Sequence, residues 1–178
     1  MHNRGSNTRV NLGQNQSQAS QFTEKNQEFE EQIVQVNRVS KKTQGGNKIG
    51  FSVLTVVGDR RGRVGVGLGK APDVSSAIKK GVSIAKKHLI EVPITNGTIP
   101  FEYYIKLGAA KVLLKPAPRG SGVIAGGAVR SVVALAGIQN ISSKVLGTKN
   151  QASNVYATIE ALKRLAVRYN AKERKVAK

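Results

Sequence analysis

Residues 63–73, RVGVGLGKAPD, carry the strongest signals for the fold of the first half of the chain. Val64, Val66 and Leu68 alternate with glycines, which predicts a β-strand with one apolar face toward the core and one bare face. Pro72 and Asp73 then predict a helix start, because proline has no amide to leave unpaired and aspartate suits the positive end of a helix. The bare face admits another backbone at close range, and both a packed helix and RNA fit that description.

These glycines do not form a nucleotide-binding loop. A P-loop needs glycine where Val64 stands and serine or threonine where Ala71 stands, and the dinucleotide pattern needs glycine where Lys70 stands. The segment 120–125 fits the looser GxGxxA dinucleotide pattern, but the acid expected about 20 residues later is absent. We therefore expect a flexible loop between Arg119 and Arg130, which either binds anions or is simply solvated.

Around this segment, the first half is predicted to contain three antiparallel strands packed under one helix. Apolar residues from about 33 to 39, 51 to 57 and 63 to 69 form the strands, and glycine-containing turns at 45–46 and 58–59 separate them. Helical spacing predicts a buried stripe on the helix, made of Val74, Ile78, Val82, Ala85 and Leu89.

A change of pattern marks the second half. Pro93, Asn96-Gly97 and Pro100 predict a boundary between two small domains, each with a modest core of its own. Beyond it we expect strands at 103–106, 111–115 and 138–146 and helices at 128–136 and 154–169, which is an α+β or βαβ arrangement. From Ala171 onward the chain is basic without an apolar pattern, so it is predicted to be a flexible arm.

Charge indicates the kind of partner. Lys and Arg number 29 against 10 Asp and Glu, the formal net charge is +19, and no acid occurs from Tyr103 to Ile159. So many cations repel one another, and phosphates relieve that repulsion best. Nucleic acid is favoured over a membrane surface, because no apolar run approaches the roughly 18 residues of a spanning helix. The glutamates at the start are expected to form a solvated segment ahead of the fold: Glu24, Glu28, Glu30 and Glu31.

Catalysis has little support in the sequence. His2 lies in a polar tail, His88 lies among lysines, and the chain has no cysteine. No spacing suits a metal, so we predict no enzyme activity, no cofactor and no metal site. Residues 1–28 are rich in Asn, Gln and Ser, which favours a disordered, solvated extension over an organellar presequence.

The predicted RNA-binding cations flank the Gly45-Gly46 hairpin and continue over the next turn, the first helix and the second half. Aromatics do not interleave with them, which favours recognition of the RNA backbone and its shape over base stacking. The expected RNA-binding residues are Arg38, Ser40, Lys41, Lys42, Lys48, Arg60, Arg61, Arg63, Lys70, Lys79, Lys80, Lys86, Lys87, Lys115 and Arg119.

Four blocks of sequence, in order, resemble one family. They are VNRVSK at 36–41 with Gly45-Gly46, VVGD at 56–59 with GRVG at 62–65, KVLLKPA at 111–117, and GVIAGGAVR at 122–130. Together they resemble the bacterial-type small-subunit ribosomal protein number five, over about residues 29–168. Ala134 and Asn140 stand where that family frequently has acids.

The resemblance implies a fold, a location and partners. Residues 29–92 would form a domain similar to double-stranded-RNA-binding folds, residues 98–169 a βαβ-type domain of the S-five domain-two-like fold, and 170–178 a basic tail. It also implies a structural, non-enzymatic protein in the small ribosomal subunit of the cytoplasm or of an organelle. Its implied partners are small-subunit rRNA, small-subunit ribosomal proteins number four and number eight, and mRNA nearby.

Two sets of residues carry roles that the resemblance implies. The loop at Val39, Ser40, Lys41 and Lys42 would approach the spectinomycin site beside rRNA that moves during translocation. Gly122 and Arg130 would belong to the interface with protein number four, where changes loosen decoding accuracy. Two other readings remain: a free-standing duplex-RNA-binding protein that uses the first domain alone, and a nucleotide-dependent enzyme, which would need acids that the second domain lacks.

Overall fold

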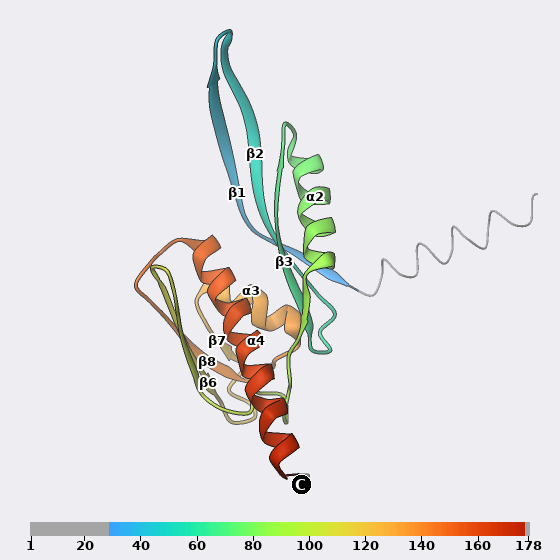
Figure 1. Ribbon diagram of the computed structural model, residues 1–178, viewed down its shortest axis with the longest axis vertical. Helices are drawn as coiled ribbons and strands as arrows, with labels where there is room; N and C mark the ends of the chain where they lie inside the picture. Colours follow the sequence, from blue (N-terminus) through green and yellow to red (C-terminus); the bar gives the residue numbers. More distant parts are fainter. Residues whose placement is uncertain (1–28, 177–178) are drawn as a thin grey trace, which may run out of the picture.

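The computed structural model describes residues 29–176 and has two sheets, with helices on both faces of the first (Figure 1). The first sheet is antiparallel with strand order β1-β2-β3-β4, and α2 follows β3. The long β1–β2 hairpin projects beyond the body of the molecule. The bounds are β1 Glu30–Thr43, β2 Gly46–Gly58, β3 Arg63–Ala71, α2 Val74–Lys87 and β4 Leu89–Glu91.

Helix α2 covers the glycine face of β3. A Cβ atom at Gly65 would meet the carbonyl of Ala85, one at Gly67 the carbonyl of Gly81, and one at Gly69 the carbonyl of Ala77. The glycines therefore allow a strand and a helix to pack backbone to backbone, and RNA cannot reach that face. The opposite face carries Val64 and Val66 into the core, as predicted.

The most buried stripe of α2 differs from the predicted one. Ala77, Gly81 and Ala85 lie deepest, together with Val82, whereas Val74 and Ile78 are only half-buried. Small residues occupy the stripe because it meets the glycines of β3. The predicted helix start is confirmed, since the Asp73 side chain accepts a hydrogen bond from the Ser76 amide at 3.2 Å.

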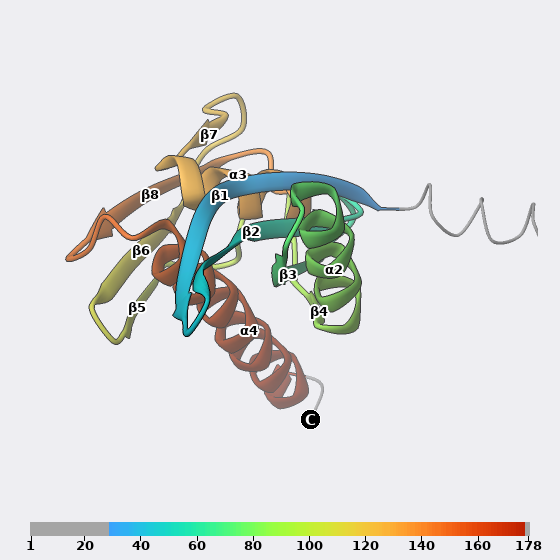
Figure 2. The same ribbon diagram turned by 90° about the horizontal axis from the view of Figure 1, so that it is seen from above.

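The second sheet contains the expected βαβ unit. Its strand order is β5-β6-β8-β7, with β7 and β8 parallel and the other pairs antiparallel. Helices α3 and α4 lie between this sheet and the first one (Figures 1 and 2). The predicted α+β fold class is confirmed. The bounds are β5 Tyr103–Leu107, β6 Ala110–Pro116, β7 Val123–Ile124, α3 Gly127–Ala136, β8 Ile141–Leu146 and α4 Gln151–Val176.

The main hydrophobic core runs through both halves, so the expectation of a separate core for each half was wrong. A second, small cluster of Val57, Val82 and Ala85 lies under α2. Leu54 and Val64 of the first sheet belong to the same buried cluster as Val132 of α3 and Leu162 of α4. The backbone joins the halves as well, because the amides of Arg60 and Gly62 donate to the last carbonyls of α3 at 3.0 and 2.9 Å. These bonds satisfy helix-end acceptors that would otherwise be unpaired.

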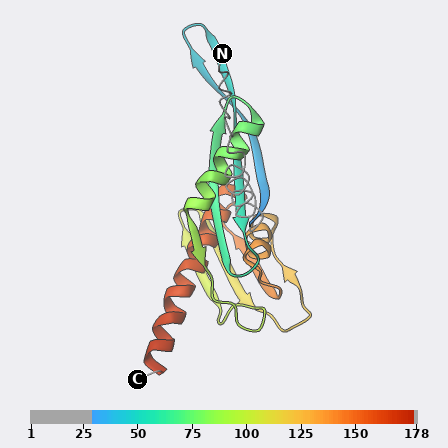
Figure 3. The same cartoon turned by 90° about the vertical axis from the view of Figure 1, so that its right-hand side faces the viewer.

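Three further expectations from the sequence differ from the structure. Helix α4 continues through Val176, where a flexible basic arm from Ala171 was predicted; Figure 3 shows its end opposite the hairpin. Glu30 and Glu31 lie in β1 and form ion pairs, so they are not a solvated segment ahead of the fold. The segment 120–127, predicted to be flexible, contains β7 and is held by hydrogen bonds. The extension predicted for 1–28 and residues 177–178 lie outside the described residues.

Candidate nucleic-acid interface

Cations line a groove on the projecting hairpin. Lys41 of β1 lies directly opposite Lys48 of β2, and both line a groove of about 510 Å³ together with Lys70 of β3. Like charges that face each other across two strands repel, and this groove has no acid in its lining. The other predicted hairpin residues, Arg38, Ser40 and Lys42, lie opposite Phe51, Ile49 and Asn47 and are exposed.

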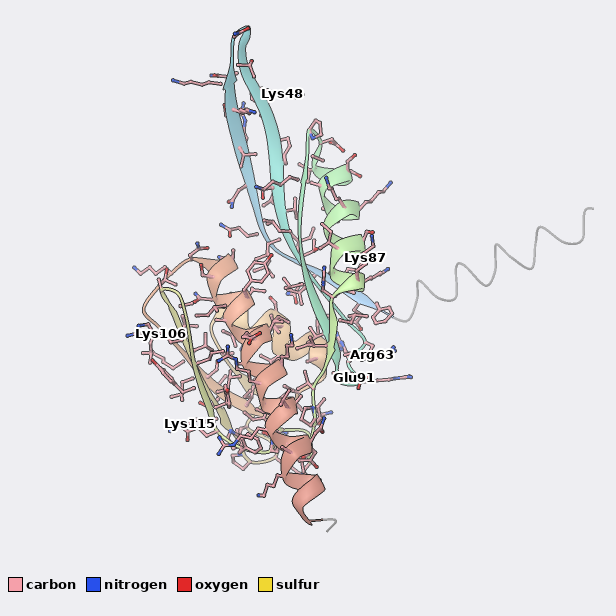
Figure 4. All side chains as sticks on the ribbon, in the orientation of Figure 1. Lys48, Arg63, Lys87, Glu91, Lys106 and Lys115 are labelled. Atoms are coloured by element: carbon pink, nitrogen blue, oxygen red, sulfur yellow. The ribbon has the colours of Figure 1, made fainter. Side chains whose placement is uncertain are left out.

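The outer face of α2 carries a second group of cations. Lys79, Lys80 and Lys87 are exposed, and Figure 4 shows Lys87 on the side of α2 away from β3. Lys86 is different, because its ammonium lies 3.4 Å from the Glu31 carboxylate of β1. This ion pair ties the helix to the edge strand.

The β2–β3 turn contains three arginines, and two of them donate hydrogen bonds to one aspartate. The Asp59 side chain, 3 % exposed, accepts from the amides of Arg61 and Arg63 at 2.8 and 2.9 Å and from Arg63 Nε at 2.7 Å. Burial raises the pKa of the Asp59 carboxyl, but the hydrogen bonds from Arg63 and Arg61 and the charge of Arg63 outweigh it and hold the pKa below its ordinary value.

The three arginine side chains differ in whether they already have a partner within the described residues. Arg60 pairs with Glu30 at 2.7 Å, and the Arg63 guanidinium also lies over the Phe29 ring, 5.1 Å from its centre. Arg61 is exposed, and its side chain has no acidic partner within the described residues. Of the three predicted contacts, Arg61 is therefore the most available to a ligand.

The lysines of β5, β6 and β8 lie on the face of the second sheet that α3 and α4 leave open. Lys106 of β5 lies directly opposite Lys111 of β6, a second like-charged pair across strands. Lys115 pairs with Glu102 at 3.4 Å, and Figure 4 shows Lys106 and Lys115 along the same part of the sheet. Arg119, near the following loop, donates to Asn96 Oδ1 at 3.2 Å.

The glycine-rich segment 120–127 is held by a residue that the sequence did not single out as functional. Asn140, 6 % exposed, accepts through Oδ1 from the amides of Gly120 and Gly122 at 3.0 and 3.2 Å. Arg130 of α3 donates to the carbonyl of Val123 at 3.0 Å. Gly122 and Arg130 thus lie in one hydrogen-bonded unit at the start of α3.

No group of three or more His, Asp or Glu side chains could hold a metal ion within residues 29–176. In that same part of the chain no helix is long and apolar enough to cross a bilayer.

A strongly basic α+β protein with lysines opposed across its strands falls in the class of proteins that assemble with a polyanion. Family models described as the N-terminal and C-terminal domains of ribosomal protein S5 match residues 29–93 and 105–174. The small ribosomal subunit protein uS5 of Thermotoga neapolitana is 52 % identical over 139 residues, which cover 78 % of each chain. The chain belongs to the ribosomal protein S5 family.

Membership in this family assigns the coarse role. The chain is a structural constituent of the small ribosomal subunit and not an enzyme, so the predicted family and ribosomal role are confirmed. The individual contact residues stay predictions at this point.

Proposed function

We propose that the chain binds small-subunit rRNA through three basic surfaces. They are the hairpin groove, which Ser40 also lines, with its neighbours Arg38 and Lys42; the outer face of α2; and the β2–β3 turn. Lys115 and Arg119 of the second half are proposed as separate contacts. The observation that carries this proposal is the direct opposition of Lys41 and Lys48 in a groove without acids. Such an arrangement costs stability unless phosphates neutralise it.

The contribution of each cation to RNA binding follows from its present partners. Lys41, Lys48, Lys70, Lys79, Lys80 and Lys87 have no acidic partner among the described residues, so they lose nothing when they turn to phosphate. Arg60, Arg63, Lys86 and Lys115 already neutralise carboxylates. We expect the first group to contribute more to affinity than the second.

The salt dependence of rRNA binding tests the proposed role of the hairpin groove. Neutralising Lys41 and Lys48 together by Lys41→Gln and Lys48→Gln should reduce the slope of log K against log salt for rRNA by about 1.4 to 1.8, since each phosphate contact contributes about 0.7 to 0.9. The matched control also removes two charges, by Lys163→Gln and Lys172→Gln at exposed positions of α4 outside the proposed surfaces. An equal loss of slope in the control would mean that net charge alone governs binding.

We further propose that the unit around Gly122 and Arg130 contacts small-subunit ribosomal protein number four and supports decoding accuracy. Number eight is a second protein neighbour, and the path along which mRNA enters lies nearby. Support comes from the arrangement of this unit, in which Arg130 holds a loop and still reaches the surface. Replacing Arg130 should raise misreading more than it lowers the yield of assembled subunits. Normal misreading in a strain with Arg130→Leu would count against this role, and Arg130→Lys is the charge-preserving control.

We also propose that Val39, Ser40, Lys41 and Lys42 approach the spectinomycin site. These residues lie near the end of the projecting hairpin, where the exposed backbone can enter a junction of RNA helices. Substitution at Ser40 should change sensitivity to spectinomycin without changing growth in its absence. Unchanged sensitivity for several substitutions across the four positions would exclude the contact.

Sedimentation distinguishes this proposal from a free duplex-RNA-binding protein. At about 0.5 M salt, weak phosphate attraction is largely screened. The chain should still migrate with the small subunit, because many shaped contacts hold it. Recovery at the top of the gradient would favour the free duplex-binding protein.

A further inference from the structure

A hollow of about 510 Å³ lies where two helices of the second half begin. Helix α3 follows β7 and helix α4 follows β8, and because these strands are parallel, both connections lie at the same edge of the sheet. Ligands of open α/β sheets commonly bind at the carboxyl ends of parallel strands. We call the hollow the cradle; it is lined mainly by Gly126, Gly127, Val145, Thr148, Lys149 and Asn154.

The charges around the cradle favour an anion. No side chain caps the start of α3, where Gly126 is the N-cap, so the first amides of that helix offer donors and a partial positive charge. Lys149 adds an exposed cation to the lining. No acidic residue lines the hollow.

The two glycines at the cradle are not required by the fold. A Cβ atom at Gly127 would meet nothing within 4 Å, and one at Gly126 would make only an ordinary contact with Val145 at 3.5 Å. Neither residue has a positive φ. Gly58 and Gly137 are the opposite case, because a Cβ there would collide with backbone. The bare surface at Gly126 and Gly127 therefore leaves room for a group from outside the chain.

A buried polar atom at the cradle also lacks a partner. Asn154, 5 % exposed, lines the hollow and donates through Nδ2 to the carbonyl of Thr148 at 3.0 Å. Its Oδ1 is buried and has no hydrogen-bond partner among the described residues. Such an acceptor is costly to leave unpaired, so a small shift of the Asn154 side chain that lets a donor from a ligand or from the ligand's water reach Oδ1 is favoured.

We infer that the cradle binds the phosphate group of a ribonucleotide. The α3 amides and Lys149 bind the phosphate oxygens, the bare glycines let the group approach the backbone, and a ribose hydroxyl or a water of hydration donates to Asn154. The same chemistry occurs in an RNA backbone and in a free nucleotide. Occupation by RNA rests on the proposed function, whereas affinity for a free phosphate does not.

Amide chemical shifts of the full chain test the inference directly. Inorganic phosphate at up to about 50 mM, a range suited to a single weakly held group, is titrated at constant ionic strength against chloride. The amides of Gly126, Gly127 and Ala128 should shift saturably. Shifts there that do not exceed those at the outer face of α2 would overturn the inference.

Variants distinguish phosphate binding in the cradle from non-specific attraction by the net positive charge. Gly127→Ala keeps the helix, because its φ suits alanine, but fills the bare surface, so the saturable shifts should disappear. Lys149→Gln should weaken phosphate binding about fivefold, as for one exposed charge pair. Lys163→Gln should leave the affinity unchanged. Phosphate binding by Gly127→Ala equal to that of the parent chain would overturn the inference.

The source of the phosphate is identified by comparing two ligands. Tighter binding of a diribonucleoside monophosphate, whose phosphate is an internal diester, supports the cradle and points to an RNA backbone. Tighter binding of a nucleoside 5′-monophosphate supports the cradle and points to a free nucleotide, and binding of neither would overturn it. If the chain fails to bind rRNA but still shows the phosphate-induced shifts, the proposed function is wrong and the inference about the cradle stands.

Discussion

Single residues at turns fix the surfaces that this protein presents, and Asn140 is the clearest example. Its buried Oδ1 accepts from two amides of the segment that contains Gly122. Asn140→Ala should lower the free energy of unfolding by about 1–3 kcal/mol and speed hydrogen exchange at Gly120 and Gly122, because two part-buried hydrogen bonds of about 0.5–1.5 kcal/mol each are lost. Asn140→Asp keeps acceptor oxygens and should preserve protection, which hydrogen exchange by NMR would check. Unchanged exchange in Asn140→Ala would show that other bonds hold the segment.

Asp59 gives the fold a defined response to acid. Because the folded chain holds the pKa of this carboxyl below its ordinary value, the unfolded chain binds its proton first as the pH falls. The stability that Asp59 contributes is therefore complete above about pH 5 and is lost progressively below about pH 4. Asp59→Asn keeps a side-chain oxygen for the amides of Arg61 and Arg63 but does not titrate. The free energy of unfolding, measured with urea from pH 6 down to pH 3, should fall less steeply for Asp59→Asn than for the parent chain. Parallel curves of this free energy against pH for the two proteins would contradict this role.

At the scale of elements, the contact between β3 and α2 is the tightest piece of packing in the first half. A Cβ atom at Gly67 would meet the backbone of Gly81 and Ala85, which cannot move aside as a side chain can. Gly67→Ala should therefore destabilise the fold by at least about 3 kcal/mol. Gly45→Ala is the matched control, because a Cβ there meets nothing within 4 Å. Equal unfolding midpoints for the two variants in urea would mean that α2 can shift to accept a methyl group.

Most of these elements follow from local sequence, and the exceptions have a common cause. Alternation and glycine turns predicted β1 to β3, and Pro72 with Asp73 predicted the start of α2. The sequence did not predict whether a helix or RNA packs against the glycine face, because glycines indicate only that some group approaches closely. β4 and β7 were missed, since strands of three and two residues show no periodicity.

The candidate surfaces were predictable in kind but not in detail. Composition alone indicated a polyanionic partner, and runs of cations indicated where it would lie. Which cations are already neutralised depends on pairing between distant segments, such as Glu30 with Arg60 and Glu31 with Lys86. The cradle likewise brings together residues 126–127 and 149–154, and only the parallel pairing of β7 with β8 places them side by side.

For the whole molecule, the shared core makes the two halves dependent on each other. Leu54, Val56, Val64 and Val66 of the first sheet would be exposed if the second half were removed. At about 25 cal/mol for each Å² of apolar surface, such exposure costs several kcal/mol. The halves present basic surfaces on the hairpin, on α2 and on the open face of the second sheet, so a fixed angle between them fixes where phosphates can bind (Figure 4).

The junction between the halves is the point at which this dependence can be measured. A Cβ atom at Gly58 would collide with the carbonyl and the side chain of Leu135 in α3. Gly58→Ala should therefore push β2 away from α3 and lower the stability of both halves together by about 2–4 kcal/mol.

The natural chromophores report on the two halves differently. All four tyrosines, Tyr103, Tyr104, Tyr156 and Tyr169, lie in the second half, whereas far-UV circular dichroism reports on both. The two signals should give coincident urea transitions in the parent chain, since a single cooperative unit loses all its structure at once. In Gly58→Ala both should move to lower urea by the same amount, and Gly45→Ala should leave both in place. If circular dichroism alone moved while tyrosine fluorescence kept its midpoint, the second half would be stable without the first, and the shared core would not couple them.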